Sequence, residues 1–281
     1  MATQKDMATQ LEKAKAFQNL HTRPGAFIIP NPWDAGTAKL LAAMGFEALA
    51  TTSLGLANTL GSSTVSLDAI LDNCRAIAEA TPLPVSVDLE NCGAHEPRRA
   101  ADAIRRAAEA GAVGGSIEDS TGDRSRPIYD FARAVERVQA AVEAARSLPI
   151  PFTLTARAEN LLHGRNDLDD TIKRLQAFEA AGANVLYAPG VHDLATIKTV
   201  VSSIGKPFNL VMGFADPTLT LAQLSEAGVK RISVGGAMSR FALAAFLTSA
   251  REMKEHGSFT YVREMAPIKE LRDAFTAVSL P

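Results

Sequence analysis

The sequence contains little cysteine and has no strong charge of either sign. Only two of its 281 residues are cysteines, Cys74 and Cys92, which is too few for a disulfide framework and indicates a reducing compartment. Lys and Arg number 29 against 31 Asp and Glu, a net charge of −2, so we do not expect the basic surface of a nucleic-acid-binding protein. No apolar run approaches the roughly 20 residues that span a bilayer, and the polar N-terminus lacks the apolar segment of a signal peptide. We therefore expect a cytoplasmic protein with neither a nucleic-acid nor a membrane partner.

Several catalytic motifs are missing as well. The sequence has neither GxGxxG nor GxxxxGK[ST], so nothing in it supports a nucleotide site. No lysine stands at the carboxyl end of a predicted strand, which argues against a Schiff-base enzyme. No two histidines have the spacing of zinc ligands on one helix or hairpin.

Eight short apolar or β-branched segments alternate with stretches of helical period. The predicted strands cover 26–30, 47–53, 84–90, 113–119, 151–157, 184–190, 207–213 and 230–236. Several of the helices between them end at a glycine that is soon followed by a strand, as in AEAGA and EAAGA. Eight such units in about 250 residues favour a (β/α)8 TIM barrel over the alternative, a doubly wound open sheet.

The whole chain, residues 1–281, is predicted to be a single barrel domain with two helical additions. Residues 1–16 form a helical lead-in, and residues 258–281 form a helical extension beyond the eighth unit. Within the barrel, Asp167 is the expected N-cap of a helix that stops at Gly182.

Charged side chains gather at the predicted carboxyl ends of three strands, where the active site of a TIM barrel forms. Asp88 and Glu90 follow the third strand, Glu118 the fourth and Arg157 the fifth. Residues i and i+2 of a strand share one side, so Asp88 and Glu90 are expected to meet Glu118. Three such carboxylates repel one another unless a cation neutralises them, and a hard divalent cation such as Mg²⁺ is the expected partner. The alternative is a buried salt bridge between one of these acids and Arg157.

Two arginines are candidate anion binders. Arg157 is a bidentate donor suited to a carboxylate or phosphonate, although it could instead pair only with Glu118 or Glu159. The Gly235–Gly236 pair opens the last barrel helix, where backbone N–H groups can cradle an anion. Arg240, about one turn further on, could reach the same anion or lie on the surface.

Seven segments occur in an order that is typical of one family: PNPWDAGTAKLL, ATTSLGLANTLG, LPVSVDLENCG, GGSIEDSTG, FTLTARAENLL, AGANVLYAPG and GVKRISVGGAMSR. Together they resemble the isocitrate lyase/phosphoenolpyruvate mutase superfamily, in the branch of shorter barrels related to 2-methylisocitrate lyase and the phosphonomutases. The resemblance covers residues 17 to 260.

The resemblance implies a role for each matching residue. Asp88 and Glu90 would lie at Mg²⁺, with Asp88 nearest, and Glu118 would complete the acidic cluster through metal-bound water. The strand-two turn of Thr52, Ser53 and Leu54 would hold the substrate carboxylate, and Arg157 would bind the substrate near its breaking bond.

The resemblance also extends to the C-terminal part of the chain. Arg240 matches an arginine of the lyase branch that we expect to bind substrate. Family members form homotetramers or homodimers in which the final helix packs on a neighbour's barrel. The C-terminal extension is therefore expected to be exchanged or packed between subunits.

The sequence departs from the family pattern in its loops. The loop after strand four reads STGDRSRPIYD and lacks the K-x-C-G-H whose thiol serves isocitrate and methylisocitrate lyases as general acid. Thr64 stands where the gating loop usually has an aspartate, and ENCGA replaces the usual E-N-G-Y-G. These changes disfavour standard methylisocitrate cleavage and mutase chemistry that depends on the loop aspartate.

The expected activity is that of a Mg²⁺-dependent lyase, with Mn²⁺ as an alternative metal and Arg157 and Glu118 as catalytic residues. It would cleave a C–C bond of a small 2-oxo or 2-hydroxy carboxylic acid through an enolate, by decarboxylation or retro-aldol cleavage. One alternative is C–P chemistry, as a mutase or hydrolase acting on phosphonopyruvate or a carboxyphosphonate. Another is a barrel that binds a 2-oxo acid without turnover.

Overall fold

Eight parallel strands form the centre of the fold in the computed structural model, which describes residues 4–278. They are β1 (Phe27–Ile29), β2 (Leu49–Ala50), β3 (Val85–Asp88), β4 (Gly114–Glu118), β5 (Thr153–Arg157), β6 (Val185–Tyr187), β7 (Phe208–Val211) and β8 (Arg231–Ser233). From β2 to β8 each strand pairs with its sequence neighbour, and β8 pairs with β1. The gap between β1 and β2 is bridged by the Ala50 amide, which donates to the Pro30 carbonyl at 3.1 Å. The predicted (β/α)8 barrel is thereby confirmed.

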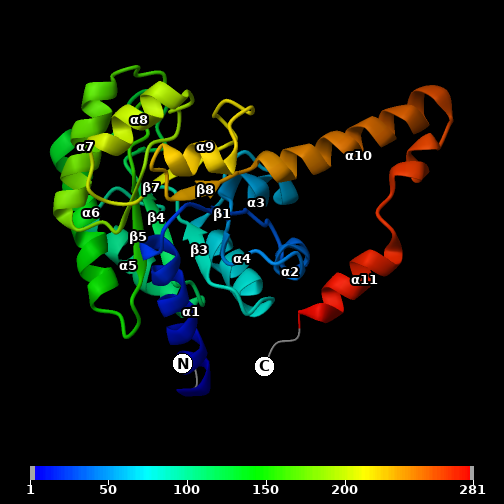
Figure 1. Cartoon of the computed structure of the whole chain (residues 1–281), viewed down its shortest axis with the longest axis horizontal. Coiled ribbons are helices and arrows are strands. Elements are labelled where there is room, and N and C mark those ends of the chain that lie inside the picture. Colours follow the sequence, from blue (N-terminus) through cyan, green and yellow to red (C-terminus); the bar gives the residue numbers. More distant parts are fainter. Residues whose placement is uncertain (1–3, 279–281) are drawn as a thin grey trace.

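Helices surround this barrel and extend beyond it at both ends of the chain (Figure 1). They are α1 (Gln4–Thr22), α2 (Ala35–Ala43), α3 (Ser53–Leu60), α4 (Leu67–Glu79), α5 (Pro97–Glu109), α6 (Phe131–Arg146), α7 (Leu168–Ala181), α8 (Leu194–Ser202), α9 (Leu221–Glu226), α10 (Ala237–His256), the 3₁₀ helix η1 (Thr260–Glu264) and α11 (Ile268–Ala277). None of the helices described is long and apolar enough to cross a membrane.

Local sequence signals set the ends of α7 as predicted. The Asp167 side chain accepts a hydrogen bond from the Asp170 amide, and Gly182 ends the helix with a φ of 107°. The second strand is shorter than its predicted range of 47–53, because Thr52 caps the N-terminus of α3 by accepting from the Gly55 amide. The residues after β2 therefore belong to a helix, not to a strand.

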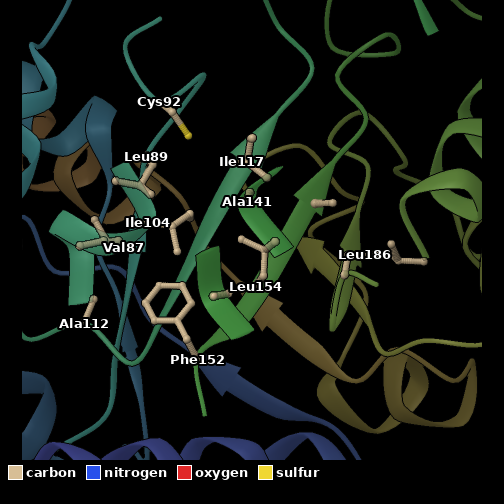
Figure 2. Close-up of a cluster of buried hydrophobic side chains, with 14 of the residues drawn as sticks. Val87, Leu89, Cys92, Ile104, Ala112, Ile117, Ala141, Phe152, Leu154 and Leu186 are labelled. Atoms are coloured by element: carbon tan, nitrogen blue, oxygen red, sulfur yellow. The ribbon is translucent and has the colours of Figure 1, made fainter. Parts of the chain in front are cut away.

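The main hydrophobic core lies between the barrel wall and its helices. Figure 2 shows Val87, Ile117 and Leu154 of β3, β4 and β5 facing the same layer as Ile104 of α5 and Ala141 of α6. Because side chains alternate along a strand, the intervening positions on these strands point into the barrel, where the polar residues lie.

Helix α1 closes the amino end of the barrel. Phe17 packs with Phe27, Ile29 and Val113 in a separate cluster. Its ring lies so close to Gly114 that a Cβ there would come within 2.8 Å of both the ring and the Thr153 carbonyl oxygen. Only glycine fits this contact. The predicted lead-in is thus part of a longer helix, and its residues 1–3 lie outside the described range.

The C-terminal helices leave the barrel. Figure 1 shows α10 projecting away from it and the chain turning back through η1 to α11, which contacts α2. The helical nature of the predicted extension is confirmed for the described residues; residues 279–281 lie outside the description.

Candidate functional site

A cavity of about 240 Å³ opens at the carboxyl ends of the strands. The cavity lies at the end of the barrel where the active site was predicted. Besides several apolar residues and the Gly235–Gly236 pair, it is lined by Asn31, Thr51, Thr52, Ser53, Leu54, Ser86, Asp88, Ser116, Arg157, Tyr187, Asn209, Arg231 and Ser233. The volume is below the ~300–1,000 Å³ of pockets for drug-sized ligands, so the cavity suits a compact polar molecule.

The polar lining follows from strand alternation. Ser86 and Asp88 on β3 are two residues apart, as are Ser116 and Glu118 on β4 and Thr155 and Arg157 on β5. In each strand a hydroxyl lies deeper in the barrel and a charged group lies near the mouth. These hydroxyl groups line the inside of the barrel, which we call the polar well, and the charged groups surround its opening, which we call the rim.

Arg157 is the centre of the rim. Its Nε donates to Glu159 Oε1 at 2.7 Å, its Nη1 to Asp88 Oδ1 at 2.9 Å, and its Nη2 lies 3.2 Å from Glu118 Oε2. Burial disfavours the charged guanidinium, but Glu159, Glu118 and Asp88 outweigh that effect and raise the pKa of Arg157. The predicted alternative of a salt bridge is therefore present, and it involves three carboxylates at once.

The same rim carries an excess of negative charge. Glu90 interacts electrostatically with Asp88, Glu159 and Arg157, and it affects Glu118 as well. Four carboxylates therefore act on one another and on a single guanidinium. Burial raises the pKa of Glu118, and the neighbouring acids raise it further against the opposing effect of Arg157. Burial and the Asp88 carboxylate likewise raise the pKa of Glu90.

Glu90 reaches the cluster by a route that the strand argument did not anticipate. Strand β3 ends at Asp88, and Glu90 has a φ of 50°, in the left-handed region. The expectation that Asp88 and Glu90 share one side of an extended strand is therefore wrong, although a turn still brings Glu90 into the electrostatic group.

The donor set suits a hard divalent cation in charge and chemistry. All of the excess groups are carboxylates, the ligands that Mg²⁺ takes together with several waters. Within residues 4–278, no three Asp, Glu, His or Cys side chains already converge as a ready-made metal cage. Arg157 lies among the acids, so a metal here would depend on few direct protein ligands and on water.

The start of α3 holds Asp88 in place. Ser53 donates to Asp88 Oδ2 through its hydroxyl at 2.8 Å and its amide at 3.1 Å. The Thr51 hydroxyl also accepts from the Asp88 amide at 3.0 Å. The predicted substrate-binding turn of Thr52, Ser53 and Leu54 therefore lies on the cavity wall, and its serine is occupied with Asp88.

Glu159 is a site residue that the sequence suggested only as an alternative partner of Arg157. Its side chain is 2% exposed and bonded to Arg157, and its amide donates to Asp119 Oδ1 at 2.8 Å. Asp119 also pairs with Arg174 at 3.0 Å, and burial raises the pKa of Asp119 to about 6. The position of Glu159, two residues beyond Arg157, was the available signal.

Other predicted residues lie apart from the rim. Arg240 is exposed on α10 and does not line the cavity, so the single chain does not bring it together with Arg157. Cys92 is buried, and burial raises the pKa of its thiol to about 12, as it does for Cys74. Neither thiol is poised as a catalytic acid.

Barrel, polar well and acidic rim define an enzyme of the lyase and mutase type found in α/β barrels. Residues 17–254 match the family model for phosphoenolpyruvate phosphomutase. The chain belongs to this phosphoenolpyruvate mutase family, as the sequence motifs predicted.

Known proteins extend the comparison. A crystal structure from Burkholderia cenocepacia J2315, provisionally described as a lyase/mutase, is 56% identical with a TM-score of 0.93 and covers 95% of this chain and 97% of that one. The 2-methylisocitrate lyase of Escherichia coli is 30% identical, covering 83% of this chain and 79% of that enzyme. An oxaloacetate decarboxylase of Bradyrhizobium diazoefficiens is 25% identical, covering 94% of this chain and 90% of that enzyme. A phosphonopyruvate hydrolase whose structure contains oxalate and Mg²⁺ has the same fold, with 21% identity and a TM-score of 0.83.

Proposed function

We propose that this chain is a Mg²⁺-dependent lyase that breaks a carbon–carbon bond in a small 2-oxo or 2-hydroxy carboxylic acid. The observation that carries the proposal is the acidic rim, where Arg157 is held by Asp88, Glu118 and Glu159 over a polar well. The relatives named 2-methylisocitrate lyase and oxaloacetate decarboxylase support the same reaction class.

Asp88, Glu90 and Glu118 would hold the metal, with water completing its shell. When bound, Mg²⁺ (or Mn²⁺) supplies positive charge for an oxygen on which negative charge develops as the C–C bond breaks. Ser53 fixes the Asp88 carboxylate through two hydrogen bonds.

Arg157 binds and orients the substrate carboxylate. A guanidinium has five N–H groups; two of them donate to Glu159 and Asp88, and Nη2 forms an ion pair with Glu118. The remaining N–H groups can donate to a carboxylate that enters the cavity. Glu159 is a positioning residue, because it holds Nε and so fixes the plane of the guanidinium.

Decarboxylation of an oxaloacetate-like acid fits the cavity better than retro-aldol cleavage. Among the described residues, no histidine, cysteine or lysine lines the cavity. Loss of CO₂ needs no proton from the protein while the bond breaks, whereas a retro-aldol reaction needs a base that removes the proton of the substrate hydroxyl as its oxygen becomes a carbonyl.

The test is the release of pyruvate by the full-length protein from oxaloacetate, 2-methylisocitrate or 2,3-dimethylmalate, with Mg²⁺ or with EDTA. We expect Mg²⁺-dependent turnover of at least one substrate above the protein-free rate. Arg157→Gln should lower kcat/KM about 100-fold or more, because buried carboxylates lose their cation. The matched control is Arg75→Gln, which removes an exposed arginine paired only with Asp72. The proposal would be overturned if none of the three substrates released pyruvate, or if EDTA did not affect the release.

We also propose that α10 packs against a second copy of the chain, giving a homodimer or homotetramer. Phe241 and Phe246 of this helix are 80% and 67% exposed, and Ser239 is its only buried residue. An apolar helix that leaves its own barrel is the kind of surface that a symmetric partner covers. Light scattering should give a mass of two or four chains, and Phe241→Glu with Phe246→Glu should give monomers. A monomeric wild type would contradict this arrangement.

A further inference from the structure

The floor of the cavity holds a second cation, Arg231, far from the acids of the rim. Arg231 is the first residue of β8, is 5% exposed and lines the cavity. Its Nε donates to Asn209 Oδ1 at 2.7 Å and its Nη2 to Thr155 Oγ1 at 2.9 Å. Its Nη1 is buried and has no hydrogen-bond partner.

No carboxylate among the side chains described, those of residues 10–278, neutralises this guanidinium. Burial lowers the pKa of Arg231 to about 10, and repulsion by the positive charge of Arg157 contributes to the lowering. Two other arginines are buried, and both have partners: the Arg137 guanidinium donates to the Ala94 and Asn91 carbonyls and stacks on Tyr129, and Arg174 pairs with Asp119 and Asp170. Arg231 therefore differs in having donors left over, at the floor of an open cavity.

The wall between the two arginines is polar. Ser86, Ser116 and Ser233 supply hydroxyls, and the Asn209 amide donates to Ser233 Oγ at 3.1 Å. An unpaired buried donor costs free energy, and an anionic ligand group would recover it. We propose that Arg231 binds a second carboxylate of the substrate, so that the cavity selects a compact dicarboxylate with one acidic group at the rim and one at the floor. The inference rests on the proposed function and specifies its substrate class.

The experiment compares two probes, malate and lactate, which differ only in the second carboxylate. Their affinities for the full-length protein are measured calorimetrically with Mg²⁺ present, beside oxalate as a short chelator. The wild type should bind malate about 30-fold or more tightly than lactate, the effect of one buried charged contact. Arg231→Gln should reduce that ratio to about threefold or less, while its affinities for lactate and oxalate stay within about threefold of the wild-type values.

A second variant keeps the inference testable if Arg231→Gln does not fold. Arg231→Lys retains the charge but loses the fork of donors, so the ratio should fall about threefold, less than in Arg231→Gln. Arg75→Gln should leave it unchanged. A wild-type ratio near one, or a ratio unaltered in the Arg231 variants, would overturn the inference and assign Nη1 to buried water alone.

The two proposals fail separately. Malate selectivity that depends on Arg231, in a protein that releases no pyruvate with Mg²⁺ from any of the three substrates, would uphold the second carboxylate site and count against the Mg²⁺-dependent lyase. Mg²⁺-dependent pyruvate release, with a malate-to-lactate affinity ratio that the Arg231 variants do not alter, would uphold the lyase and count against the second carboxylate site.

Discussion

His21 should make the stability of this protein fall as the pH drops from 7.5 to 5. The imidazole is packed at the amino end of the barrel between the rings of Phe17 and Phe27. Its Nδ1 lies 2.8 Å from the Phe17 carbonyl oxygen, so Nδ1 carries the proton of the neutral ring, and Nε2 is buried without a partner. Burial and the nearby Arg231 lower the pKa of His21 from 6.5 to about 3, with a smaller contribution from Lys230.

The size of the effect follows from these two pKa values. Because the folded-state pKa is the lower one, the unfolded chain binds the proton more tightly, and stability is fully present only above about pH 6.5. It is lost progressively as the pH falls toward about 3. At pH 5 the two pKa values correspond to a loss of about 2 kcal/mol of unfolding free energy relative to pH 7.5.

The measurement is urea unfolding of the wild type and His21→Gln at pH 7.5, 6 and 5, at one protein concentration. Glutamine can keep the bond to the Phe17 carbonyl but does not titrate. The stability difference between the two proteins should therefore shift by about 2 kcal/mol in favour of the variant between pH 7.5 and 5. His163→Gln, in the exposed loop after β5, controls for the loss of an imidazole. A His21→Gln difference that is constant with pH would refute the reasoning.

Three further predictions test other contacts. Ser53→Ala removes the 2.8 Å bond to Asp88 Oδ2 and should raise the Mg²⁺ concentration needed for half-maximal activity about tenfold or more; an unchanged Mg²⁺ titration would contradict the role of Asp88. Gly114→Ala places a Cβ 2.8 Å from the Phe17 ring and should lower the unfolding free energy by about 1–3 kcal/mol, whereas wild-type stability in urea would show that α1 yields. Burial raises the pKa of both cysteine thiols to about 12, so a disulfide thiol reagent at pH 8 should label neither in the folded protein and both in denaturant; rapid native labelling would refute their burial.

The site shows which inferences a sequence supports. Asp88, Glu118 and Arg157 could be placed at one end of the barrel because parallel strands all present their carboxyl ends on the same side. Glu159 and Arg231 were not selected. Glu159 depends on how the chain turns after β5, and Arg231 stands at the start of β8, away from the carboxyl ends where the active site was expected.

Glu90 shows the limit of periodicity. The rule that residues i and i+2 face the same way holds only while the backbone is extended, and the left-handed turn at Glu90 breaks it. Arg240 shows a different limit, because α10 leaves the barrel, and nothing in the local helical pattern fixes that direction.

The sequence by itself determined the alternation of strands and helices, the helix ends at Asp167 and Gly182, and the end of the barrel that carries the acids. These properties follow from local backbone preference and side-chain period, which act over a few residues. Only the tertiary structure decided that one guanidinium lies among three carboxylates and that a second lies unpaired on the floor. Both depend on distances between strands far apart in the chain, and the energy of a buried charge depends on all the groups that surround it.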